Sequence, residues 1–116
     1  MKHLTYTDKS LLVGDKVADL LTRYAALIGD QGHADTIDVH GFGADGSEVV
    51  ATFVLNNGIS LMAETVTTSM NEPDNSDAEN YLTRAIDLIV DPPKAGADPQ
   101  PWPDFVDDVE DPATTE

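Results

Sequence analysis

The sequence contains no cysteine among its 116 residues. A disulfide framework, a thiolate zinc site and a cysteine nucleophile are therefore excluded. The first residues, MKHLTYTDKSLLVGDK, also lack the apolar core of a signal peptide, and no apolar run approaches the length of a membrane span. These absences predict a cytoplasmic protein that does not enter a membrane.

Basic residues are scarce. Six Lys and Arg stand against 22 Asp and Glu, which gives a formal net charge of −16 at pH 7. Binding to nucleic acid or to an anionic membrane surface requires a basic surface, so we expect neither as a partner. The charge favours a basic protein partner, although adaptation to high salt explains the same composition without any partner.

Catalytic motifs are missing too. The chain has no G-x-S-x-G nucleophile elbow and no P-loop. The glycines of GFGADG, residues 41–46, precede a polar turn and a strand pattern, whereas a dinucleotide site needs a helix there. The sequence therefore indicates no catalytic residue and no cofactor, and it favours a protein that is not an enzyme.

The hydrophobic fraction of 41% is typical of a globular domain. Apolar residues recur with helical spacing in residues 15–28 and 76–90, and Asp15 and Gly29 are placed to begin and end the first helix. Residues 3–14 predict a strand or a short hairpin before that helix.

Between the helices, alternating apolar residues in 34–43, 47–55 and 59–70 predict three strands. Asn57 and Gly58 suit a type I′ turn between the last two, so we expect a three-stranded antiparallel meander. The predicted fold is α+β, with two helices packed on one face of a small, mainly antiparallel sheet in the order β-α-β-β-β-α. The other face stays free for a partner or for a homodimer.

The α-β-β-β-α order of residues 15–90 resembles that of double-stranded RNA-binding domains. With the preceding strand it also resembles ribosome-associated hibernation factors. Those families place basic residues at the start of their second helix, where this chain has Asp74, Asp77 and Glu79. The resemblance therefore implies a fold and not RNA binding.

The acidic segment NEPDNSDAEN, residues 71–80, has two interpretations. Ser76 followed by Glu79 matches a capping box, which places the carboxylates at the positive end of a helix dipole. A regular calcium-binding loop starting at Asp74 does not fit, because several of its positions hold the wrong residue type. An irregular Ca²⁺ site is the remaining alternative, with the candidate ligands Glu72, Asp74 and Asp77.

A zinc site is the second metal hypothesis. Asp38 and His40 are two residues apart on a predicted strand and point to the same, solvent-facing side. His3 would supply a third ligand if the first strand paired beside residues 36–42. We expect exposed polar side chains and no metal, because two ligands do not make a site.

The composition changes after Val90, so we divide the chain into a compact domain, residues 1–90, and an extended Pro-rich acidic tail, residues 91–116. The tail holds the single Trp of the protein within PWPDFVDDV. Solvated linkers rarely carry such apolar side chains, so we expect this segment to dock on the domain or on a partner. The residues expected at that contact are Trp102, Asp104, Phe105, Val106, Asp107 and Asp108.

These observations favour a small acidic interaction protein, an adaptor or inhibitor, that binds a basic partner through its outer sheet face or its tail. One alternative is a small metal-binding or hydrolytic domain that uses carboxylates and histidine. The other is a salt-adapted domain whose acidity has no specific partner.

The capping interpretation predicts the response to calcium. Millimolar Ca²⁺ should raise the melting temperature no more than Mg²⁺ at the same ionic strength, because carboxylates at a helix start form no closed oxygen cage. Thermal unfolding followed by circular dichroism measures this. A saturating, Ca²⁺-selective rise would contradict it.

Overall fold

The computed structural model describes residues 1–93, which form an α+β domain with the element order β-β-α-β-β-β-α. The predicted fold class is confirmed, and the N-terminal segment is a hairpin. The strands are β1 (Lys2–Tyr6), β2 (Lys9–Val13), β3 (Asp35–Phe42), β4 (Glu48–Leu55) and β5 (Leu61–Thr65), and the helices are α1 (Asp15–Asp30) and α2 (Ser76–Val90).

The five strands form one antiparallel sheet with the order β4-β3-β2-β1-β5. The predicted meander is therefore wrong, because β5 pairs with β1 and not with β4. Neither Asn57 nor Gly58 has the positive φ of a type I′ turn. Instead, the side chain of Asn56 accepts a hydrogen bond from the amide of Gly58 (2.8 Å), and the loop carries the chain from one sheet edge to the other.

The sheet bends sharply where β2 meets β3. Their register joins Leu12 to Phe42, and within the described residues the pairing extends no further. Gly41 lies at this corner, and a Cβ added there would stand 2.7 Å from Leu11 Cγ and from the carbonyl oxygen of Leu12. Glycine is thus required for the hairpin β1–β2 to cross β3 this closely.

The first helix begins and ends elsewhere than predicted. Gly14 is its N-cap, so Asp15 is the first helical residue and not the cap. Gly29 lies inside the helix, and the residue with left-handed geometry is Gly32, at φ 72°. Amide hydrogen bonds from His33 to Ile28 (2.9 Å) and from Gly32 to Gly29 (3.2 Å) form a Schellman motif, which satisfies the last carbonyls of the helix.

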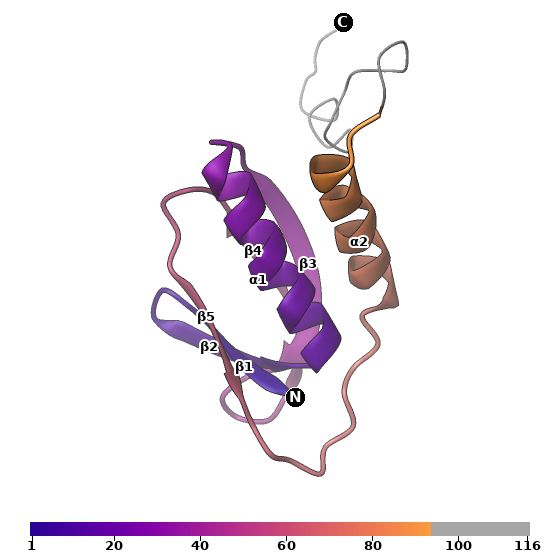
Figure 1. Cartoon of the computed structure of the whole chain (residues 1–116). Helices are drawn as coiled ribbons and strands as arrows, with labels where there is room; N and C mark the ends of the chain where they lie inside the picture. The colour runs from indigo at the N-terminus through magenta and orange to yellow at the C-terminus, as the bar shows by residue number, and fades with distance from the viewer. Residues whose placement is uncertain (94–116) are drawn as a thin grey trace, which may run out of the picture.

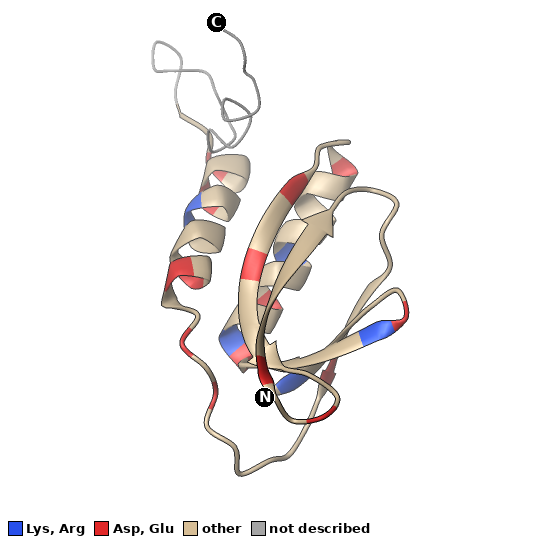
Figure 2. Cartoon of the chain, turned by 180° about the vertical axis from the view of Figure 1, so that it is seen from behind, with Lys and Arg blue, Asp and Glu red and all other residues tan. Residues whose placement is uncertain are grey.

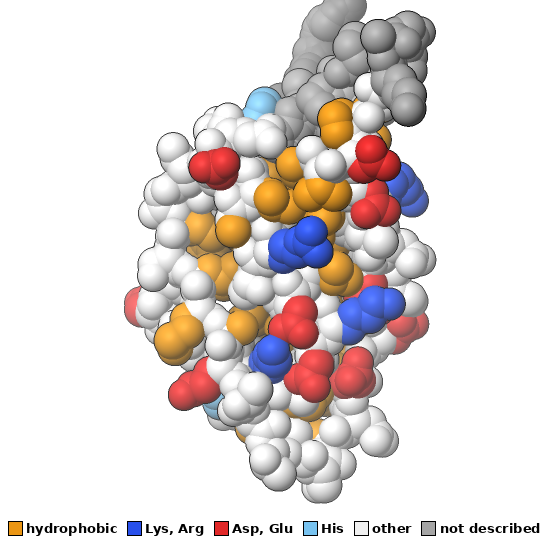
Figure 3. Space-filling view, viewed as in Figure 1, with side chains coloured by type: hydrophobic (Ala, Val, Ile, Leu, Met, Phe, Trp, Pro, Cys, Tyr) orange, Lys and Arg blue, Asp and Glu red, His pale blue; other side chains and the backbone are white. Residues whose placement is uncertain are grey.

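The apolar face of α1 lies across the sheet, and α2 packs against α1 and beside β3 (Figure 1). Figure 3 shows hydrophobic side chains along the seam between the helices, bordered by charged ones. No helix within residues 1–93 has the length and apolarity needed to cross a bilayer. Of the residues that the periodic patterns place in the core, eight are buried, namely Leu21, Tyr24, Ile37, Val39, Phe53, Leu55, Ala85 and Ile86. Four others, Leu20, Leu27, Tyr81 and Ile89, are only partly buried and pack against the edge of this core.

A polar contact joins the helices inside this core. The Asp35 side chain, which belongs to a residue only 5% exposed, accepts hydrogen bonds on Oδ2 from the hydroxyls of Tyr24 and Tyr81, both at 2.6 Å. Its Oδ1 accepts from the amide of Thr36 at 2.7 Å. Because α1, α2 and β3 each contribute a residue, the carboxylate fixes the distance between the three elements.

This contact predicts a loss of stability at high pH. Burial, and then the hydrogen bond to Asp35, raises the pKa of Tyr24 from its ordinary value of 10.0. The unfolded chain therefore ionises at this tyrosine first, so its contribution is fully present below pH 10.0 and falls as the pH rises further.

Tyr24→Phe should lower the unfolding free energy at pH 7 by roughly 1.5–3 kcal/mol, because a hydrogen bond to a charged group is lost. The difference between wild type and variant should shrink above pH 10.0, where the unfolded wild type gains ionised tyrosine. Urea unfolding across this range tests both statements. A difference that stays constant from neutral to alkaline pH would refute the second.

Candidate functional site

The start of α2 is fixed to the free part of the β3 edge by Asn75. Its Oδ1 accepts from the amide of His40 (2.7 Å), and its Nδ2 donates to the carbonyl oxygen of the same residue (2.8 Å). The side chain therefore replaces a neighbouring strand at the point where β2 has turned away. Asn75 is 4% exposed, so its side chain is largely shielded from water where it makes these two bonds.

The predicted capping box is wrong for this reason. Asn75 occupies the N-cap position, and its side chain is engaged with β3, so it does not cap the helix. Ser76 is the first helical residue, and both its amide (2.9 Å) and its hydroxyl (2.6 Å) donate to Asp74 Oδ1. The carboxylates Asp77 and Glu79 do lie in the first turn, as predicted.

A groove of about 510 Å³ lies between the outer side of the hairpin β3–β4 and the start of α2. We call it the acidic groove, because four carboxylates line it. Figure 2 marks acidic positions both on β3 and around the start of α2. Its lining residues are Asp38, His40, Glu48, Val50, Asp74, Asn75, Ser76, Asp77 and Ala78.

Hydrogen bonds orient two of the carboxylates in this groove. The hydroxyl and then the amide of Ser76 hold the pKa of Asp74 below its ordinary value, and the nearby charge of His40 acts in the same direction. Asp38 accepts from the hydroxyl of Thr52 at 2.6 Å. The carboxylates of Asp38 and Asp74 are thus held in place by neighbouring hydroxyl groups.

Exposed valines continue this surface along β4. Val50 is 57% and Val54 46% exposed, whereas the alternating residues Phe53 and Leu55 are buried. A side chain that is apolar and half in water gains free energy when a partner covers it. The outer face of β3 and β4 therefore combines acidic groups with apolar contact area.

The structure does not assemble the predicted metal sites. His3 lies on β1, and β2 separates that strand from β3, which carries Asp38 and His40. Glu72 lies against Gly14 at the start of α1, whereas Asp74 holds Ser76. Within residues 1–93, no group of three or more His, Asp or Glu side chains is arranged to hold a metal ion.

The acidic groove also lacks the connections of a nucleophile. Ser76 supplies a hydroxyl group to the lining of this groove. That hydroxyl donates directly to the carboxylate of Asp74, so no histidine lies between the two side chains as a general base. Such a bond orients the chain before α2.

Sequence reasoning placed Asp38 and His40 on an outward strand face and Asp74 and Asp77 at a helix start, and the structure brings all four to one groove. It missed Asn75, whose contact is 35 residues away and leaves no local pattern. The predicted tail contacts, Trp102, Asp104, Phe105, Val106, Asp107 and Asp108, lie outside the described residues.

No protein-family model, curated protein or solved structure matches the chain at a significant level.

The two hydrogen bonds between Asn75 and His40 should contribute measurably to the unfolding free energy of the protein. Asn75→Ala should lower the unfolding free energy by roughly 1–3 kcal/mol, because it leaves the amide and carbonyl of His40 unpaired. Ser76→Ala, the change that a capping box would make costly, should stay within roughly 0.5 kcal/mol, because this side chain is exposed. Urea unfolding measures the loss of unfolding free energy in both variants. Equal losses would contradict a stabilising role for the Asn75 side chain that is larger than that of Ser76.

Proposed function

We propose that this protein is a small, non-catalytic interaction protein of the cytoplasm that binds a basic partner protein on the outer face of β3 and β4. The observation that carries the proposal is the acidic groove beside Val50. Four carboxylates, Asp38, Glu48, Asp74 and Asp77, line a concave site whose rim is an exposed valine. Such a surface complements a segment that carries Arg or Lys next to an apolar residue.

The carboxylates are set for a cationic side chain rather than for a metal ion. They come from β3, β4 and the start of α2, and those of Asp38 and Asp74 already accept hydrogen bonds from hydroxyls. A guanidinium has several donors in one plane and can bond to carboxylates on both sides of a groove. Arginine is therefore the residue that this site suits best.

Self-association is a second candidate, and the edge of β4 favours it. His40 bonds to Asn75 on the side away from β4, so its partner Val50 must direct its own amide and carbonyl to the free edge of the sheet. Only Glu48 among the eight residues of β4 is charged. A second copy could pair along this edge, although the acidic groove does not require it.

The proposal predicts a site-specific effect of charge. The probe is a fluorescent peptide that alternates Arg and Val, titrated with the full-length protein and followed by anisotropy. Asp38→Asn combined with Asp77→Asn should weaken binding roughly two- to thirtyfold, because two exposed charge pairs are lost. Val50→Ser should weaken it further by removing the apolar contact.

Matched variants separate this from a general effect of net charge. Asp30→Asn combined with Glu64→Gln removes the same charge from exposed positions elsewhere and should leave binding unchanged. Met62→Ser is the control for Val50→Ser, since the two residues are 53% and 57% exposed. Equal losses in target and control variants would refute the proposed site, and light scattering at each concentration would reveal dimerisation.

A further inference from the structure

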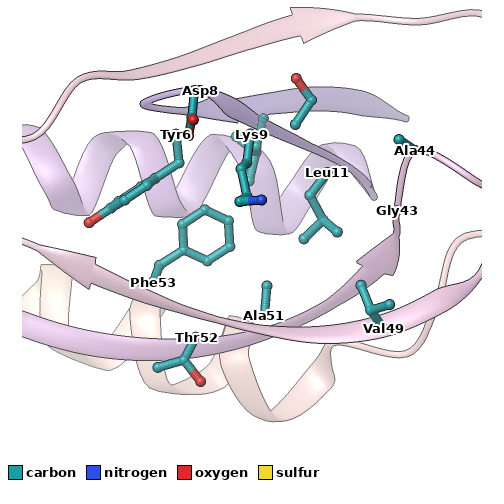
Figure 4. A pocket seen from close by; sticks show the side chains of 12 residues that line it. Tyr6, Asp8, Lys9, Leu11, Gly43, Ala44, Val49, Ala51, Thr52 and Phe53 are labelled. Atoms are coloured by element: carbon teal, nitrogen blue, oxygen red, sulfur yellow. The ribbon is translucent and has the colours of Figure 1, made fainter.

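A second groove lies on the other side of β4, between that strand and the hairpin β1–β2 (Figure 4). We call it the hairpin groove, and its volume is about 530 Å³. It exists because β2 leaves β3 after the corner at Gly41, so that the hairpin and β4 diverge like the sides of a wedge. Its apolar lining comes from Leu4, Tyr6, Leu11, Val49, Ala51 and Phe53.

Successive residues of β4 line two different grooves. Val49 and Ala51 belong to the hairpin groove, whereas Glu48 and Val50 line the acidic groove. This follows from the period of a strand, in which neighbouring side chains point to opposite faces of the sheet. Figure 4 shows Ala51 directed toward the hairpin β1–β2 and Thr52 directed away from it. The backbone of β4 therefore separates an apolar site from an acidic one.

This backbone is also an open edge of the sheet. Within residues 1–93, no strand pairs with β4 on the side away from β3. Val50 directs its amide and its carbonyl to that side, because its partner His40 bonds to Asn75. Glu48 and Thr52, two residues before and after Val50, do the same. Their hydrogen-bonding groups are available to an added strand.

One end of the edge is closed. The rings of Tyr6 and Phe53 meet edge to face, with centroids 5.6 Å apart, and the Tyr6 hydroxyl donates to the carbonyl oxygen of Val54. The hairpin β1–β2 thus reaches β4 at this point. The stretch that remains open to another strand is residues 48–52, which an extended segment of about five residues covers.

We propose that an extended segment of the basic partner adds to β4 at residues 48–52 as an antiparallel strand. This inference rests on the proposed function and names the way in which the partner binds. The side chains of an added strand alternate between the two faces of the sheet. One set therefore enters the mouth of the hairpin groove, and the other set lies beside the acidic groove.

The hairpin groove suits bulky apolar side chains. Val49 is 38% exposed, so a side chain that covers it removes apolar surface from water. Ala51 contributes only a methyl group, which leaves the middle of the groove open (Figure 4). Asp8 and Lys9 both line the groove, and their opposite charges favour neither an acidic nor a basic occupant. We therefore expect the inward residues of the segment to be large and apolar, such as Leu.

The outer face suits basic side chains. Glu48 borders the added strand directly, and Asp38 lies one strand behind it, where the long side chain of an Arg can reach. A second copy of this chain supplies no such cation, because both edge strands, β4 and β5, carry a glutamate and neither carries Lys or Arg. The charge therefore favours a basic partner over a second copy on this edge.

Selective N-methylation of a peptide tests the strand pairing. In an antiparallel pair, two residues that exchange backbone hydrogen bonds have their side chains on the same face. The β4 residues that direct their amides to the open edge carry outward side chains, so the Arg residues of the segment, and not the apolar ones, must donate to β4. The probe is a fluorescent peptide that alternates Arg and Leu, titrated with the full-length protein and followed by anisotropy.

Methylation of two central Arg amides should weaken binding roughly tenfold or more, because hydrogen bonds to the sheet edge are lost. Methylation of the two neighbouring Leu amides should leave binding within about twofold, since these amides face the solvent. The two peptides have the same composition, charge and number of methyl groups, and thus each is the matched control of the other.

A protein variant locates the inward side chains. Ala51→Phe fills the hairpin groove and should weaken binding of the unmethylated peptide roughly fivefold or more, because the Leu side chains lose their site. Ala26→Phe, on the exposed side of α1, should leave binding unchanged. Circular dichroism verifies folding, and the methylated peptides decide the question with the unaltered protein if Ala51→Phe does not fold.

Three results would overturn the proposal. Equal effects of methylation at the Arg and the Leu amides would exclude the added strand, while the proposed function would stand if binding still depended on Asp38 and Asp77. No binding of the unmethylated peptide would overturn both. A dimer in light scattering that the peptide does not dissociate would assign the edge to a second copy.

Discussion

The crossing of β2 over β3 at Gly41 is the constraint on which the rest of the structure depends. The two hairpins touch where Leu12 meets Phe42, and the missing side chain of Gly41 lets the backbones approach. From this corner the hairpins diverge, which deprives β3 of a neighbouring strand along most of one edge. A buried edge cannot be left with unpaired amides and carbonyls, so another element must supply hydrogen bonds. Asn75 supplies two of them at His40.

Both grooves follow from this divergence. On one side, the start of α2 is brought to β3 by Asn75, and the acids that precede and follow this residue come to face those of the sheet. On the other side, the wedge between the hairpin and β4 stays open because Ala51 is small. The two sites differ in chemistry because their walls come from different faces of β4. Its outer face carries Glu48 beside the exposed valines, and its inner face carries residues of the core.

Much of the fold could be predicted from local patterns, and its strand pairing could not. Helical spacing identified α1 and α2, and alternation identified the buried side of β4 through Phe53 and Leu55. The same alternation in β5 shows which side chains face inward but contains no information about the neighbouring strand. Asn57 and Gly58 favoured a hairpin between β4 and β5, but β5 pairs with the open edge of β1 instead. Competition between edges is a property of the whole sheet, and no window of sequence expresses it.

The polar contacts were the least predictable part, and they determine where α2 lies. Its apolar face, with Leu82, Ala85 and Ile86, explains why it is buried against α1. Apolar burial is not directional, however, and would tolerate a helix displaced or rotated on the same surface. Hydrogen bonds to Asp35 and His40 are directional, and they hold α2 at Tyr81 and at its first turn. Two fixed points on a rigid helix define its axis. The position of the acidic groove therefore depends on two polar side chains, Asp35 and Asn75, that sequence patterns would assign to loops and solvent.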